Sequence, residues 1–150
     1  MWTDTQTQTI LTDDDLLKAL AGCGPQIIVI EGPTGCGKTK LLRRLKAVEC
    51  RSMITLAEDD FMRSLTARLK PASPDIPFDI LAAEYEVICI DDIDLLHAYN
   101  ATQLEAADQF SRACIRSVII LSGIRCCERL RVLLGALTVP YSVFTHSPEQ

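Results

Sequence analysis

One eight-residue segment constrains the fold of this chain more than any other feature. Residues 32–39 read Gly-Pro-Thr-Gly-Cys-Gly-Lys-Thr, which fits the pattern G-x-x-x-x-G-K-[ST] at every fixed position. A β-branched run at 26–31 precedes the segment, and a helical pattern from about 38 to 48 follows it. A buried strand, a glycine-rich turn and a helix in this order form the context in which the pattern binds a chain of phosphates.

The residue types in this segment suit a triphosphate chemically. Glycines allow the backbone to curl so that successive N–H groups point inward, and a helix beginning near Lys38 directs its positive end to the same place. We expect Lys38 to contact the β- and γ-phosphates and the Thr39 hydroxyl to ligate Mg²⁺. A glycine-rich turn with an incidental lysine is the alternative. The candidate cofactor-binding residues here are Gly32, Pro33, Thr34, Gly35, Cys36, Gly37, Lys38, Thr39 and Lys40.

Strand and helix patterns alternate along the chain, which is typical of an α/β domain with a parallel sheet covered on both faces. Predicted strands lie at 26–31, 52–57, 86–91, 117–122 and 141–145. Predicted helices lie at 13–21, 38–48, 58–69, 102–114 and 125–134, with a short helical turn at 80–84 and a proline-rich loop at 70–79. Residues 1–12, rich in Thr and Gln, read as a flexible lead-in to one domain over 13–150.

Polar side chains end two of the predicted strands. Asp91 and Asp92 end the third strand, at the edge where open α/β sheets bind ligands. We expect Asp91 to hold Mg²⁺ through its water shell and Asp92 to polarise an attacking water. Ser122 ends the fourth strand, where its hydroxyl could reach between the γ-phosphate and the acids. The alternatives are solvated or helix-capping acids and a plain strand-ending turn. The predicted catalytic residues are therefore Asp92 and Lys38, the metal ligands Thr39 and Asp91, and the cofactors ATP and Mg²⁺.

Composition narrows the class of protein. The 150 residues carry a net charge of −5, which argues against a generally basic surface that coats nucleic acid, although weak DNA binding stays possible. The cations of the 38–48 helix favour a solvated face over a DNA-contact patch. No apolar run approaches the length of a membrane span, the N-terminus lacks the pattern of a secretory signal, and the seven cysteines read as reduced thiols. We therefore expect a cytoplasmic protein.

The segments MITLAEDDFMRSLTARL, VICIDDIDLL, SVIILSG and RLRVLLGALTV, in this order after the phosphate loop, resemble a known family. Over about residues 24–147 the chain is similar to the nucleotide-binding core of the bacterial replication initiator DnaA and its AAA+ relatives, the DnaA-homologous regulators and DnaC-type helicase loaders. The resemblance implies a P-loop NTPase of AAA+ type: a three-layer fold with a five-stranded parallel sheet, ATP with Mg²⁺, and nucleotide-dependent self-assembly or partner binding in replication initiation. Lys38 and Thr39 match the Walker A pair, and Asp91 and Asp92 match the Walker B pair.

The sequence also departs from the family. Gly123, beside Ser122, occupies the place of the first sensor Asp, and the arginine-finger position falls on Leu133 unless Arg131 substitutes. No helical lid is expected after the last predicted strand. Because a missing finger weakens stabilisation of the transferring phosphoryl group, we expect slow hydrolysis at most. The leading hypothesis is a nucleotide switch or weak ATPase in replication initiation or its regulation. The alternative is a non-catalytic DnaA-like module that joins or blocks a replication assembly, and a small P-loop kinase ranks last.

Overall fold

The structure of the chain is a computed structural model that describes residues 1–69, 72, 74–91, 93, 103–124 and 141–146. Within these residues the chain forms one sheet and five α-helices. The strands are β1 (Trp2–Asp4), β2 (Ile10–Leu11), β3 (Ile27–Glu31), β4 (Met53–Leu56), β5 (Val87–Ile90), β6 (Val118–Gly123) and β7 (Tyr141–His146). The helices are α1 (Asp13–Leu20), α2 (Lys38–Val48), α3 (Glu58–Leu65), the 3-10 turn η1 (Ala67–Leu69), α4 (Phe78–Glu84) and α5 (Gln103–Arg116).

The sheet corrects the prediction of five parallel strands. Its order is β2-β1-β7-β3-β6-β5-β4, and it has seven strands. The five strands from β7 to β4 run parallel, as the sequence predicts. β1 pairs antiparallel with both β2 and β7, so residues expected to be a lead-in extend the sheet. The sequence signal is weak there because Trp2 is the one large buried side chain of this hairpin, and one apolar residue makes no period.

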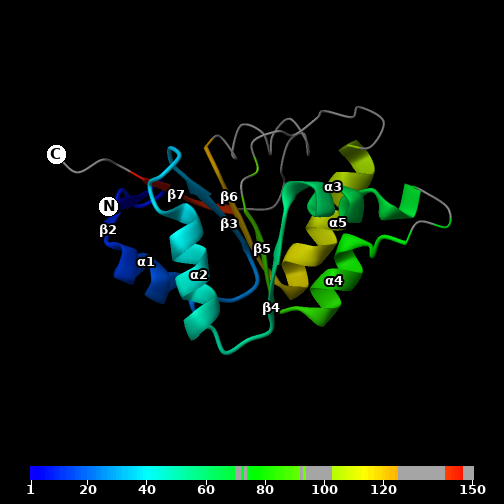
Figure 1. Cartoon of the computed structure of the whole chain (residues 1–150), viewed down its shortest axis with the longest axis horizontal. Helices are drawn as coiled ribbons and strands as arrows, with labels where there is room; N and C mark the ends of the chain where they lie inside the picture. The colour runs from blue at the N-terminus through cyan, green and yellow to red at the C-terminus, as the bar shows by residue number, and fades with distance from the viewer. Residues whose placement is uncertain (70–71, 73, 92, 94–102, 125–140, 147–150) are drawn as a thin grey trace.

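Helices cover both faces of the sheet, giving three layers (Figure 1). Alternate residues of β3 enter different cores: Ile27 and Val29 pack with α3, α4 and α5, whereas Ile28 and Ile30 pack with α1 and α2. All four side chains are at most 3% exposed, so burying each contributes about 1.5–3 kcal/mol. The continuous apolar run of this central strand follows from its position between two helical layers.

Helix ends follow local chemistry. Thr12 caps α1 in a capping box with Asp15, as the run of acids after Thr12 predicts. The predicted 58–69 helix ends early: the Thr66 hydroxyl donates to the Met62 carbonyl at 3.0 Å, and the backbone tightens into η1. Leu69 is therefore 46% exposed instead of continuing the apolar face. Among the described residues, no helix combines the length and apolar character needed to cross a bilayer.

Candidate functional site

The loop between β3 and α2 has a backbone that only glycines adopt readily. Gly35 has a φ of 84° and Gly37 a φ of 103°, both in the left-handed region. The Cys36 amide donates to the Pro33 carbonyl at 3.2 Å, which closes the turn. Gly37 occupies the N-cap of α2, where it supplies no side-chain cap, and the first helical turn contains no acid. The first N–H groups of α2 therefore begin a helix end that favours an anion.

Gly32 is required for a different reason, close packing. A Cβ at this position would lie 2.6 Å from Cys36 Sγ and 2.9 Å from the Cβ of His146 on β7. The Gly32 amide also donates to the carbonyl of Gly123, at the end of β6, at 3.2 Å. The loop is thus held against the carboxyl ends of both strands that flank β3.

Lys38 lies inside the loop. Its side chain is buried, and Nζ donates to the carbonyl oxygens of Gly32 at 2.6 Å and Pro33 at 3.1 Å. Cys36 Sγ lies 3.9 Å from the same Nζ. Because a buried ammonium needs acceptors, these carbonyls stabilise the charge at the centre of the loop. Phosphate oxygens are acceptors of the same kind with a full negative charge, so they can replace the carbonyls.

Asp91 joins two hydroxyl groups from distant parts of the chain. Thr39 Oγ1, on α2, donates to Asp91 Oδ2 at 2.9 Å, and Ser122 Oγ, on β6, donates to Asp91 Oδ1 at 2.6 Å. Ser122 is fully buried, whereas Thr39 is exposed. The backbone fixes this arrangement, because the Ile93 amide donates to the Ser122 carbonyl at 2.8 Å. A carboxylate beside an exposed hydroxyl is an oxygen donor set that suits Mg²⁺.

The predicted site residues divide into three groups. The structure brings Gly32, Lys38, Thr39, Asp91 and Ser122 together around the carboxyl ends of β3, β5 and β6. Pro33, Thr34, Gly35, Cys36 and Gly37 form the rest of the loop. Lys40 is exposed on α2, and its side chain makes no hydrogen bond or ion pair with a described residue. Asp92 lies outside the described residues.

Sequence reasoning missed His146 at this site, and it named Gly123 without predicting that this residue contacts Gly32. The imidazole of His146 contacts the indole of Trp2 edge to face, with ring centroids 4.9 Å apart. Sheet register brings Gly123 and His146 to the loop. Glu31, at the end of β3, pairs with Gly123 on one side and with Thr145, next to His146, on the other. No local pattern in the sequence carries this information.

The geometry fits a nucleoside triphosphate with a divalent cation. It combines a glycine-shaped loop at a helix N-terminus, a central ammonium and a hydroxyl–carboxylate pair. The first two parts have the chemistry to bind phosphate oxygens, and the third has the oxygen donors that a hard cation prefers. The side-chain chemistry of the described residues is therefore compatible with a phosphate chain and a divalent cation.

Comparison with known proteins gives matches among solved structures. No family model matches the sequence, and no curated protein matches it. Domain III of the replication initiation protein DnaA from Thermotoga maritima is 17% identical, with a TM-score of 0.62 over 92% of this chain and 60% of that one. A replication initiator DnaA bound to AMPPCP and single-stranded DNA is 22% identical, with a TM-score of 0.59 over 90% of this chain and 44% of that one.

Pif1 helicase from Bacteroides, in complex with ADP-AlF3 and single-stranded DNA, is a more distant match. It is 18% identical, with a TM-score of 0.52 over 77% of this chain and 32% of that one. This chain thus spans less than two thirds of the length of each of these three proteins. At these identities the likeness concerns the fold. The fold of this chain is similar to that of domain III of DnaA, and in this chain an antiparallel hairpin continues the parallel strands at the β7 edge.

Proposed function

We propose that this domain binds ATP with Mg²⁺ at the loop between β3 and α2 and acts as a nucleotide switch or weak ATPase in DNA replication or its regulation. The observation that carries the proposal is the contact of Thr39 and Ser122 with the two oxygens of Asp91, next to the buried Lys38. Hydroxyl groups from two separate elements, α2 and β6, meet there on a carboxylate that follows β5. Such convergence is typical of a ligand site at the carboxyl edge of an α/β sheet.

Each residue then has a role that its position supports. Lys38 would hold phosphate oxygens in place of the loop carbonyls it now contacts, and the backbone of Gly35 and Gly37 would turn N–H groups toward them. Thr39 and Asp91 would hold Mg²⁺, which neutralises charge on the phosphates when bound. Ser122 keeps the Asp91 carboxylate oriented through its 2.6 Å hydrogen bond. With this set of residues, the nucleotide would be held mainly by its phosphates.

Hydrolysis requires a further group that orients water. From the sequence, Asp92 would be that group, acting as a general base next to Asp91. The likeness of the fold to DnaA supports a role in DNA replication, in which nucleotide state controls assembly with a protein partner. A slow reaction suits such a switch, because the nucleotide state must persist while the partner is bound.

Nucleotide binding is tested by the fluorescence of mant-ATP titrated with the full chain and Mg²⁺. We expect saturable binding that Lys38→Ala weakens at least about tenfold, since the central charge contributes about 1.4 kcal/mol or more. Lys18→Ala, which removes an exposed lysine on α1, is the matched control and should leave binding unchanged. Wild-type protein that shows no binding at millimolar nucleotide, or a Lys38→Ala variant that binds as wild type does, would contradict the proposal.

A measurement of phosphate release from ATP distinguishes the nucleotide switch or weak ATPase from the non-catalytic module. We expect slow turnover that Asp92→Asn abolishes without weakening mant-ATP binding. Pull-down of partners with and without ATP and Mg²⁺, with Lys38→Ala as a third condition, tests the switch itself. Recovery of the same partners in all three conditions would favour the module that uses its DnaA-like surface independently of nucleotide.

A further inference from the structure

Among the described strands, β4 is paired on one side only. In the described sheet its one neighbour is β5, so β4 is an edge strand, and Figure 1 shows it between α2 and α3. The Val87 amide donates to the Ser52 carbonyl at 3.0 Å, and the Asp91 amide donates to the Leu56 carbonyl at 3.2 Å. The backbone N–H and C=O groups of the even-numbered residues in this segment therefore point toward β5.

The odd-numbered residues of β4 face the other way. Because hydrogen-bonding direction alternates along a strand, Met53 and Thr55 each direct one N–H and one C=O away from the sheet. No described residue accepts from or donates to these groups. Thr55 is exposed, so solvent reaches this edge. An extended segment from outside the described chain could pair with it by main-chain hydrogen bonds.

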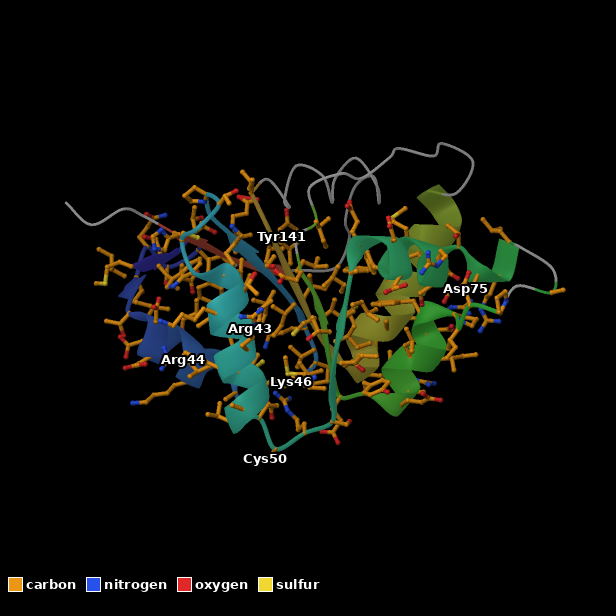
Figure 2. All side chains as sticks on the ribbon, in the orientation of Figure 1. Arg43, Arg44, Lys46, Cys50, Asp75 and Tyr141 are labelled. Atoms are coloured by element: carbon orange, nitrogen blue, oxygen red, sulfur yellow. The ribbon has the colours of Figure 1, made fainter. Side chains whose placement is uncertain are left out.

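Two cations of α2, Arg43 and Lys46, lie toward this edge on the α2 side of the sheet. Figure 2 shows Arg43 and Lys46 on the side of α2 nearer β4, with Arg44 on the side toward α1. Arg44 pairs with Asp14, whereas Arg43 and Lys46 form no ion pair with a described residue. Burial raises the pKa of Cys89 on β5 to about 12, the negative charges of Asp91 and Glu49 add to the rise, and the positive charge of Lys46 opposes it with the smallest effect of the four.

The opposite face at this edge is apolar. Ile54, whose side chain is on the α3 side of the sheet, is half-buried against the core, and Met62 on α3 is half-buried beside the same cluster. Side chains alternate between the two faces of a sheet. In a strand added beyond β4, every second side chain would therefore lie on the side of Arg43 and Lys46, and the others would lie on the side of Ile54 and Met62.

We propose that β4 is a docking edge for an extended segment of a partner protein in which acidic residues alternate with apolar ones. Its main chain would pair with Met53 and Thr55, its acids would face Arg43 and Lys46, and its apolar side chains would pack beside Ile54. A second copy of this chain fits less well, because twofold pairing of two β4 edges brings two cationic α2 helices onto the same side. Nucleic acid has no peptide backbone, so it cannot form the strand-to-strand hydrogen bonds for which the β4 edge is arranged.

The test is fluorescence anisotropy of a labelled peptide of alternating Glu and Val, about eight residues long, titrated with the full chain. A block peptide of the same composition, all Glu followed by all Val, is the matched control for charge. We expect the alternating peptide to bind at least about tenfold more tightly than the block peptide. Combined Arg43→Glu and Lys46→Glu should weaken its binding at least about tenfold, a loss of about 1.4 kcal/mol, and Lys18→Glu should leave it unchanged.

Thr55→Pro tests the main-chain pairing. The Thr55 N–H points away from β5, so proline removes a docking donor without removing a bond of the sheet, and we expect at least about tenfold weaker binding. In case this variant does not fold, peptides N-methylated at every second residue, in both registers, give the same test on the wild-type protein. One register should lose binding and the other should keep it.

Equal binding of the alternating and the block peptides would overturn the docking edge, and so would equal binding of the two N-methylated registers. Displacement of the peptide by an oligo-dT strand, to the same extent in wild type and in Thr55→Pro, would also overturn it, because the site would then bind nucleic acid without main-chain pairing. Lys38→Ala should bind the peptide normally, because Lys38 faces the loop carbonyls and not β4. If the protein did not bind nucleotide, the proposed docking edge would therefore be unaffected. If the peptide did not bind, the proposed nucleotide site would be unaffected.

Discussion

Substitution of Gly32 by alanine tests the packing of the phosphate loop most directly. The added methyl group would lie 2.6 Å from Cys36 Sγ and 2.9 Å from the Cβ of His146. Cys36 Sγ ends a short side chain that can rotate away. The Cβ of His146 cannot move in this way, because it is attached to the backbone of β7, which pairs with both β1 and β3. The loop or the strand must therefore shift.

The expected cost follows from overpacking. Inserting a methyl group into a closely packed site costs about 1–3 kcal/mol, which for a chain of this size lowers the midpoint of thermal unfolding by about 3–10 °C. Nucleotide binding should weaken as well, because the Gly32 carbonyl that positions Lys38 Nζ moves with its residue. Cys36→Ala removes the sulfur contact and leaves the contact with His146, so it should recover part of the stability lost.

Thermal unfolding followed by circular dichroism measures all four proteins of this cycle: wild type, Gly32→Ala, Cys36→Ala and the double variant. We expect the loss on adding the methyl group to be smaller in the Cys36→Ala background but still present. A Gly32→Ala protein as stable as wild type would refute the packing argument. Full recovery in the double variant would show that the His146 contact does not restrict this position.

Three further predictions follow from contacts near the site and at the base of the sheet. Ser122→Ala removes a donor from Asp91 and should lower both the free energy of unfolding, by about 1–2 kcal/mol, and the affinity for Mg²⁺ with mant-ATP; unchanged values for both would argue against an orienting role. The hydrogen bond from the Arg51 side chain lowers the pKa of Glu49 to about 2, so this pair stabilises the fold above pH 4.5 and the stabilisation is lost as the pH falls from about 4.5 to 2. Glu49→Gln should lower the free energy of unfolding at pH 7 by about 1 kcal/mol in urea unfolding and should flatten the pH dependence over that acidic range, and an unaltered pH profile would contradict the assignment. Trp2→Phe should destabilise the fold by about 1–3 kcal/mol in the same assay, because the fully buried indole loses volume and its 2.7 Å hydrogen bond to α1; a neutral result would mean that the N-terminal hairpin adds no stability.

The parts of the fold with strong local chemistry could be predicted. The β-branched run at 26–31 predicts β3 because a strand buried on both faces needs apolar residues throughout. The bounds of α2 agree with the predicted 38–48 because Gly37 begins the helix and the apolar period then continues to Val48. Where local signals conflict, prediction fails: Leu69 continues the apolar period of α3, but Thr66 ends the helix before it.

The N-terminal hairpin shows a second kind of failure. Trp2 is fully buried in β1, yet a single apolar residue among Thr and Gln shows no periodic pattern from which a strand could be predicted. Its partner in the sheet is also remote in sequence, because Trp2 pairs with His146 on β7. The predicted Asp92 and the helix expected at 125–134 lie outside the described residues, so they stay predictions.

The sequence by itself determined the central strand β3 and the helix α2 that follows it, because glycines at turns and apolar periods act over a few residues. It also predicted the kind of ligand, since two glycines, one lysine and one threonine occur at the spacing of the phosphate-binding pattern. Tertiary structure alone decided which polar ends meet. Asp91 is 52 residues from Thr39 and 31 from Ser122, and sheet order brings all three together. Strand order and register are set by the burial of whole faces against distant helices, and no short window of sequence contains both partners of such a contact.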